Sequence, residues 1–149
     1  MAPPPIRGIA ETVLYADDLP ASAAFFRAVM RLEPVFESDG LVVFACGTAQ
    51  NLLVFDRTVA AADKRLPGGT IPGHRGEGAA HMAFHVSHAD YPRWRDHFAA
   101  EGVDVVSEVG FEGGGRSLYF RDPAGNVVEL ATPGHWRSFC DRRVFRMTP

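Results

Sequence analysis

Alternating apolar and polar positions near the end of the chain predict a β-hairpin. The runs Ser117–Arg121 and Val127–Ala131 are short, rich in aromatic and β-branched residues, and flank Asp122–Gly125. Asp, Pro and Gly in that order favour a type I turn, a common link between antiparallel strands. Glu129 lies on the strand face opposite Val128. Because a carboxylate is unfavourable to bury unless it is paired or binds a metal, Glu129 is a candidate functional residue.

Two stretches of the chain repeat the same order of predicted elements: a strand, a helix and about three strands. The first stretch predicts a strand over 9–16, a helix over 21–32 that Pro34 ends, and strands over 35–38, 41–46 and 51–56. The second predicts a strand over 80–86, a helix over 89–101 that Gly102 caps, and strands over 103–109, 117–121 and 127–131. This repetition indicates an internal duplication, in which packing of half-sheets buries their apolar faces.

The segment between these stretches, residues 57–79, is rich in glycine and in charges of both signs. A plain connection of this length is uncommon in a compact domain. It is therefore either a linker between two modules or a lid over a site. His74 and Arg75 within it either close over such a site or stay in solvent.

Composition supports a folded protein without a strongly basic surface. The chain has 149 residues, 46% of them hydrophobic and 22% charged, with a formal net charge of −3. This balance argues against nucleic acid as the partner. No apolar run is long enough to span a bilayer, and the N-terminal sequence MAPPPIRG has no secretory apolar segment, so we expect a cytoplasmic protein without membrane contact. Cys46 and Cys140 define no disulfide framework.

The tail from Pro133 is basic. It carries four arginines against one aspartate, namely Arg137, Arg142, Arg143 and Arg146 against Asp141. Such a tail either binds an acidic partner or an anionic substrate, or it is simply solvated or packed.

Three ionisable residues occupy related places in the two stretches. Glu11 and His81 begin the first strand of each, and Glu129 lies on the last strand of the second. If the sheets curl, the three side chains face one cavity, and one histidine with two carboxylates suffices for a divalent metal with open positions. Periodicity by itself does not bring them together, because His81 also suits an ordinary hydrogen-bonded position and Glu129 an edge strand in water.

Three segments of the sequence resemble the vicinal oxygen chelate superfamily, the group of glyoxalases, bleomycin resistance proteins and extradiol dioxygenases. They are ETVLYADDLPASAAFF, HMAFHVSHADYPRWRDHFAAEGV and RSLYFRDPAGNVVEL, of which the last is the most specific, and they cover most of residues 9–131. The resemblance implies an α+β fold in which two βαβββ modules form a cupped mixed sheet with helices on the outer face. It divides a single domain, 1–149, into module 8–56, loop 57–79, module 80–132 and tail 133–149.

The resemblance also implies a set of metal ligands. His81 and Glu129 fall on ligand positions of the family, and Glu11 falls where a histidine or glutamine is usual. The implied cofactor is a divalent ion: Zn, Ni, Mn, Co or Fe. Aligning the run 51–54 with 126–129 places Val54 at a fourth ligand position of many glyoxalases, where valine cannot coordinate. The set also differs from the two histidines and one carboxylate typical of non-haem iron oxygenases.

The implied function is that of a glyoxalase-like lyase or isomerase, whose metal chelates a small oxygen-rich substrate. Glu11 and Glu129 are the predicted catalytic carboxylates, with Glu11 preferred as the base. Ser117, Tyr119 and Arg121 share the strand face of Glu129 and are predicted to bind substrate, although Arg121 equally suits an ion pair or a loop contact. The alternative is a protein that sequesters a small molecule or antibiotic, as bleomycin resistance members do. Family analogy implies a homodimer.

Overall fold

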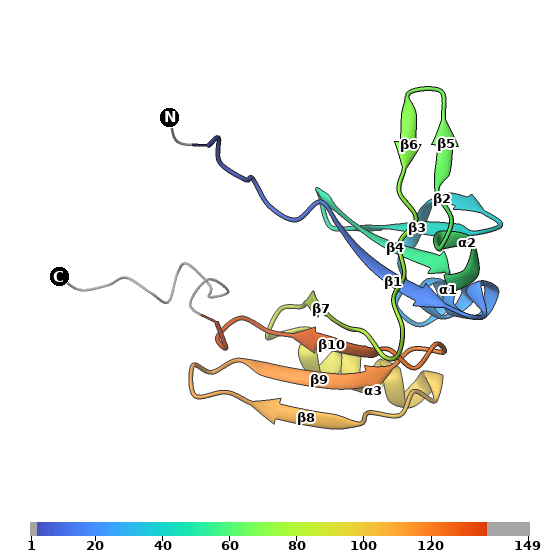
Figure 1. Ribbon diagram of the computed structural model, residues 1–149. Coiled ribbons are helices and arrows are strands. Elements are labelled where there is room, and N and C mark those ends of the chain that lie inside the picture. The colour runs from blue at the N-terminus through green and yellow to red at the C-terminus, as the bar shows by residue number, and fades with distance from the viewer. Residues whose placement is uncertain (1–2, 137–149) are drawn as a thin grey trace. The chain divides into compact units, whose positions relative to one another are not determined.

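The computed structural model describes residues 3–136 and divides the chain into two compact units, 1–78 and 79–149 (Figure 1). We call them module one and module two. Each holds a four-stranded mixed sheet and a helix in βαβββ order, which confirms the predicted α+β fold of two such modules. The loop 57–79 falls almost wholly in module one. No helix among the described residues is long and apolar enough to cross a membrane.

Module one has strand order β1-β4-β3-β2, with β1 parallel to β4. Its elements are β1 (Glu11–Ala16), α1 (Leu19–Ala28), β2 (Glu33–Ser38), β3 (Leu41–Cys46) and β4 (Gln50–Asp56). Helix α1 begins earlier than predicted because the Asp18 carboxylate accepts the Ala21 amide at 2.9 Å as an N-cap. It ends earlier because Arg31 takes a left-handed conformation, φ 54°, before Pro34 is reached.

One face of the module one sheet packs against α1. Phe26 of the helix contacts Phe44 of β3, with ring centroids 5.9 Å apart, and Leu14, Leu52 and Val54 are buried on the same face. Burial of these side chains supplies the main stabilisation of the module. The opposite face carries Glu11 at one end of β1 and Tyr15 near the other.

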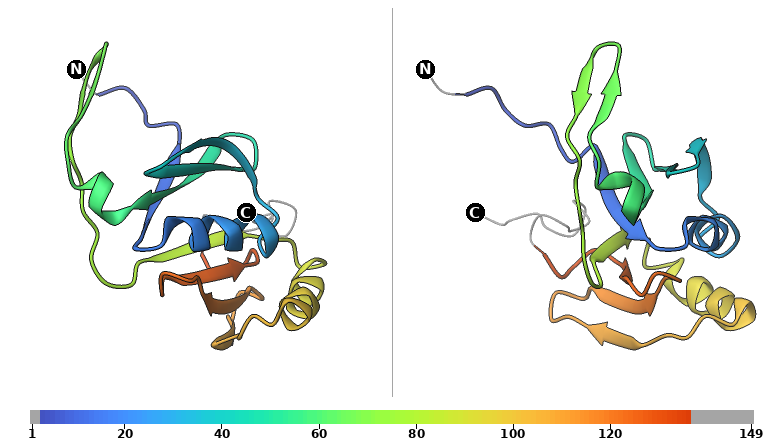
Figure 2. Two further views of the ribbon diagram at one scale, coloured as in Figure 1. Left: turned by 90° about the vertical axis from the view of Figure 1, so that its right-hand side faces the viewer. Right: turned by 45° about the vertical axis from the view of Figure 1, so that its right-hand side comes forward.

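The segment 57–79 contains regular structure that the sequence pattern did not predict, and its role as a linker or a lid stays a prediction. It holds α2 (Arg57–Ala60) and a hairpin of β5 (Lys64–Leu66) and β6 (Gly69–Ile71) that projects from the sheet of module one (Figures 1 and 2). The Asp56 carboxylate starts α2 by accepting the amides of Thr58 and Val59. Residues 72–77 then return to the sheet as an extended segment, which we call the strap.

Module two repeats the topology with strand order β7-β10-β9-β8. Its elements are β7 (His81–His85), α3 (Tyr91–Glu101), β8 (Ser107–Gly110), β9 (Arg116–Arg121) and β10 (Val127–Ala131). Gly102 ends α3 in the left-handed conformation, φ 69°, as predicted. The strand predicted over 103–109 starts only at Ser107, because the Val103 amide is used to close the helix by donating to Phe98.

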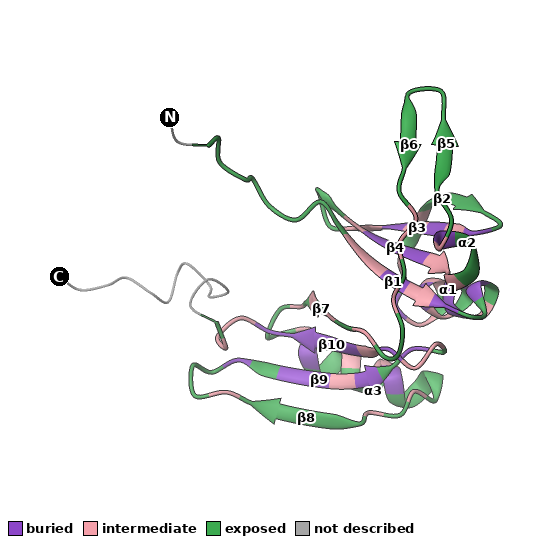
Figure 3. Cartoon of the chain, in the orientation of Figure 1, coloured by how far each residue is buried: buried purple, intermediate pink, exposed green. Residues whose placement is uncertain are grey.

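The core of module two lies between α3 and one face of its sheet. Phe98 of α3 meets Phe120 of β9 with ring centroids 4.6 Å apart, and Leu118, Val128 and Leu130 are also buried. Figure 3 shows buried stretches, in purple, along β9, β10 and α3. The alternation along β10 therefore turns Glu129 to the other face, as predicted.

The turn of the predicted hairpin also anchors β7. The Gly125 amide donates to the Asp122 carbonyl at 2.9 Å, which closes the turn. The buried Asp122 carboxylate accepts the backbone and side-chain amides of Asn126, each at 2.8 Å. The Asn126 side-chain oxygen in turn accepts the Ala80 amide at 3.0 Å, immediately before His81. The turn thus fixes the place at which β7 begins beside β10.

Strand registers match the two modules position by position. The Asn51 amide donates to the Ala10 carbonyl in module one, and the Val127 amide donates to the Ala80 carbonyl in module two. Glu11 pairs with Asn51 as His81 pairs with Val127, so these first-strand positions correspond.

The same registers correct one detail of the sequence alignment. Two residues further along each last strand, Leu53 corresponds to Glu129, whereas Val54 lies on the buried face beside α1. The alignment through Val54 is therefore wrong by one residue. Leucine cannot coordinate a metal either, so module one still supplies no ligand at this position.

Candidate functional site

His81 and Glu129 form a pair on neighbouring strands of module two. The Nε2 atom of His81 lies 3.3 Å from Oε2 of Glu129. The histidine side chain is 54% exposed and the carboxylate only 6%, so one partner faces solvent and the other is enclosed. The structure therefore brings together two of the three predicted ligands.

In each residue, one side-chain atom is hydrogen-bonded elsewhere and the other faces its partner. Nδ1 of His81 lies 3.2 Å from the Val127 carbonyl, which only accepts, so Nδ1 carries a hydrogen. Ser117 donates its hydroxyl to Oε1 of Glu129. Nε2 and Oε2 face one another, and either they share a hydrogen or both bind one cation.

This geometry fits a divalent metal. Two donors about 2.1 Å from one ion, at tetrahedral or octahedral angles, stand about 3.0 to 3.4 Å apart. The observed 3.3 Å between Nε2 and Oε2 lies in that range. Hydrogen bonds between ligating side chains and outer groups are usual in metal sites. Here His81 donates to the Val127 carbonyl, and Ser117 donates to the Glu129 carboxylate.

The third predicted ligand, Glu11, is exposed at the start of β1 in module one. Its participation stays a prediction. Within each module of the described chain, residues 3–136, no three His, Cys, Asp or Glu side chains are grouped so that they would hold an ion together.

Tyr119 lies beside the pair on β9. It is the cross-strand partner of Glu129, and its ring centroid is 6.2 Å from that of His81. Burial, and next the negative charge of Glu129, raise the pKa of Tyr119 above its usual value. Like an ordinary tyrosine, the phenol is protonated at neutral pH and can donate a hydrogen bond.

The other two predicted substrate contacts differ in exposure. Ser117 is fully buried, and its hydroxyl is used by Glu129. Arg121 is exposed and donates to the Gly125 carbonyl at 2.8 Å, so it contacts the hairpin turn rather than Asp122.

The strap brings an additional aromatic cluster to the face of module one that carries Glu11. Nδ1 of His74 lies 2.6 Å from the Tyr15 hydroxyl, and its ring packs edge-on against Phe55 at 4.7 Å. His74 is thus half-buried on the sheet rather than free in solvent. Tyr15 was not among the predicted site residues, although alternation along β1 puts it on the same face as Glu11.

The basic tail lies largely outside the described residues. The four arginines of the predicted basic segment and Cys140 fall within 137–149, so their predicted roles stay predictions.

Known proteins resemble the chain over nearly its whole described length. The sequence profile of the glyoxalase/bleomycin resistance protein/dioxygenase superfamily matches residues 8–130. A crystal structure of lactoylglutathione lyase from Agrobacterium tumefaciens is 39% identical, with a TM-score of 0.82, covering 90% of this chain and 99% of that one.

More distant structures share the fold. A glyoxalase/bleomycin resistance protein/dioxygenase from Nocardioides is 20% identical, with a TM-score of 0.66 over 89% of this chain and 85% of its own. A fosfomycin resistance protein from Mesorhizobium loti is 22% identical, with a TM-score of 0.58, covering 85% of this chain and 92% of its own. Profile, topology and the 39% identical structure agree, and the chain belongs to the glyoxalase/bleomycin resistance protein/dioxygenase superfamily.

Proposed function

We propose that the protein is a metal-dependent, glyoxalase-type lyase or isomerase acting on a small oxygen-rich substrate. The observation that carries this proposal is the pair of His81 and Glu129, whose donor atoms are 3.3 Å apart and supported by hydrogen bonds from outside. Similarity to the Agrobacterium tumefaciens lactoylglutathione lyase makes lactoylglutathione the first substrate to test.

The metal ligands in this proposal are Nε2 of His81, Oε2 of Glu129 and the carboxylate of Glu11. A divalent ion bound by these residues would supply Lewis-acid chemistry at a substrate carbonyl. Glu11 replaces the neutral ligand usual in the family, so it brings a negative charge and a group able to accept a proton. We assign it the role of general base for a proton on the carbon next to the carbonyl.

Residues of β9 orient the substrate. Tyr119, the cross-strand partner of Glu129, donates its phenol hydrogen to a substrate oxygen. Arg121 keeps further N–H groups beyond the one that Gly125 accepts, and these bind an anionic part of the substrate. Ser117 holds the Glu129 carboxylate in place and is a positioning residue rather than a substrate contact.

The site draws on both modules, and in this family modules combine within one chain or across two chains. We propose a homodimer for this protein. Light scattering of the purified protein measures the oligomeric state. One chain holds one copy of each proposed ligand, so we expect one metal ion per chain.

The test of the function combines metal content with activity. Purified protein is stripped of metal, loaded separately with Zn, Ni, Mn, Co or Fe, and assayed for formation or breakdown of the lactoylglutathione thioester by absorbance. We expect activity that depends on metal. Glu129→Gln removes a proposed ligand, so it should abolish this activity and weaken metal binding more than loss of an outer hydrogen-bond partner does.

The matched control is Glu112→Gln, which removes an exposed carboxylate of the same module. It should leave both metal affinity and activity unchanged. A protein that binds no metal after loading, yet binds small organic ligands equally well with and without Glu129, would contradict the proposal and favour sequestration.

A further inference from the structure

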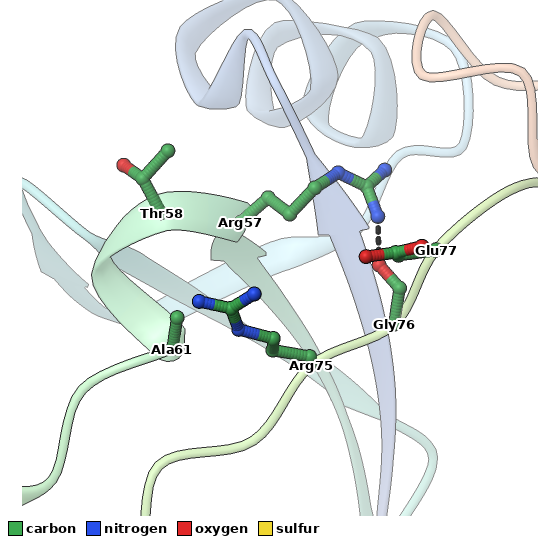
Figure 4. A pocket seen from close by; sticks show the side chains of 6 residues that line it. All are labelled: Arg57, Thr58, Ala61, Arg75, Gly76 and Glu77. Atoms are coloured by element: carbon green, nitrogen blue, oxygen red, sulfur yellow. Dashed lines mark hydrogen bonds between the residues drawn. The ribbon is translucent and has the colours of Figure 1, made fainter.

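Module one contains a pocket formed by α2 and the strap. Its volume is about 250 Å³, and it is lined by Arg57, Thr58, Ala61, Arg75, Gly76 and Glu77 (Figure 4). None of these residues belongs to the proposed metal site, and the pocket is not needed for the proposed function.

One guanidinium of the pocket is held in place before any ligand arrives. Nε of Arg57 donates to Asp17 at 2.8 Å, and Nη1 donates to the carbonyl of Gly76 in the strap. The side chain is only 21% exposed. Because these contacts use two of its five N–H groups, Arg57 retains donors in a fixed orientation.

The second guanidinium, that of Arg75, has no hydrogen bond or ion pair with any residue of the described chain, 3–136. Its side chain extends from the strap toward α2 (Figure 4). The lining thus holds two cations and one carboxylate, that of Glu77. The Asp17 carboxylate, which neutralises part of the charge of Arg57, is not part of the lining.

We propose that this pocket binds a small oxyanion between Arg57 and Arg75, with the phosphate group of a small molecule as the preferred ligand. Guanidinium groups match the geometry of phosphate and carboxylate oxygens and form charge-assisted hydrogen bonds with them. Two guanidinium groups from different segments can contact different oxygens of one tetrahedral phosphate. A planar carboxylate offers two oxygens and satisfies fewer of these donors.

The bound anion has a structural consequence for the strap. Arg57 belongs to α2, whereas Arg75 belongs to the strap that also places His74 on Tyr15. An anion bridging the two arginines therefore adds a second connection between the strap and α2, beside the hydrogen bond from Arg57 to the Gly76 carbonyl. Binding should slow hydrogen exchange of the strap amides, which ordinary surface binding of salt would not do.

The experiment is calorimetric titration of the full-length protein with inorganic phosphate, sulfate and acetate at constant ionic strength. We expect saturable binding of phosphate with a dissociation constant near about 1 mM or below. Arg75→Gln should weaken it by about tenfold or more, since one charged partner is lost. Arg65→Gln, which removes an exposed arginine from the nearby hairpin, should not.

Arg75 makes no hydrogen bond or ion pair with residues 3–136, so we expect its replacement to leave the fold intact, and thermal unfolding of Arg75→Gln in phosphate-free buffer checks this. Chemical shift changes at the amides of Gly76 and Glu77 on adding phosphate locate the ligand. Tighter binding of acetate than of phosphate would support an oxyanion site and reassign it to carboxylates. Equal phosphate binding by wild type and Arg75→Gln, or no saturable binding of any of the three anions, would overturn the proposal.

Discussion

Nε2 of His81 and Oε2 of Glu129 lie 3.3 Å apart across strands β7 and β10. The distance matters because the two residues differ in environment: the carboxylate is enclosed and the imidazole reaches solvent. An enclosed carboxylate without a cation beside it is unfavourable, so the pair either shares a proton or binds a metal.

Ser117→Ala removes the hydroxyl that donates to Oε1 of Glu129. The freed carboxylate loses its fixed orientation, so we expect the affinity for a divalent metal to fall by about 10 to 100-fold. Competition with a chromogenic chelator measures this. Ser107→Ala, on the exposed strand β8, is the control and should change nothing. An unaltered metal affinity in Ser117→Ala would mean that Ser117 does not position the carboxylate.

Tyr15→Phe removes the hydroxyl that contacts Nδ1 of His74 at 2.6 Å. A half-buried hydrogen bond of this kind contributes about 0.5 to 1.5 kcal/mol. We expect faster hydrogen exchange at residues 72–77 and little change in strand β7. Combining Tyr15→Phe with His74→Ala should cost less than the sum of the two single changes, and strict additivity would show that the contact contributes no coupling.

Gly76→Ala tests how closely the strap packs on β1. A Cβ atom at this position would lie 2.4 Å from Cδ2 of the Tyr15 ring, so the strap or the ring must move. We expect a loss of about 1 to 3 kcal/mol in the free energy of unfolding. Gly68→Ala, where the added atom meets nothing within 4 Å, is the matched control. Equal stability of the two variants in urea unfolding would show that the strap is loosely held.

Tyr91 makes the free energy of unfolding depend on pH in the alkaline range. Burial, and next the charge of Glu108, raise the pKa of this phenol. The folded protein disfavours the ionised form of Tyr91. The contribution of Tyr91 to the free energy of unfolding is therefore complete below the ordinary tyrosine pKa of about 10, and it is lost as the pH rises through the higher pKa of the folded protein.

Tyr91→Phe should therefore reduce the slope of unfolding free energy against pH between about pH 9 and 11. At neutral pH it should cost about 1 kcal/mol, because the hydrogen bond to the Ser117 carbonyl is lost. Urea unfolding of both proteins across this range measures the effect. The same alkaline slope in both would contradict the assignment.

Patterns along the sequence predicted the elements that neighbouring residues determine. Alternation predicted the hairpin over 117–131 and the face on which Glu129 lies, and the turn chemistry of Asp122–Gly125 placed the bend. Gly102 marked the end of α3 because only a left-handed residue suits that position. The motif over 116–130 indicated the family and, with it, the likeness of His81 and Glu129 to metal ligands.

The sequence by itself therefore determined the two βαβββ repeats, the buried faces and the superfamily, but not α2 or the hairpin of β5 and β6. The tertiary structure decided that Leu53 rather than Val54 corresponds to Glu129, because register depends on hydrogen bonds between strands far apart in the chain. It also decided that Ser117 donates a hydrogen bond to Glu129, that His74 is hydrogen-bonded to Tyr15, and that Arg57 and Arg75 line one pocket. These contacts join residues with no periodic relation, so no pattern along the chain encodes them.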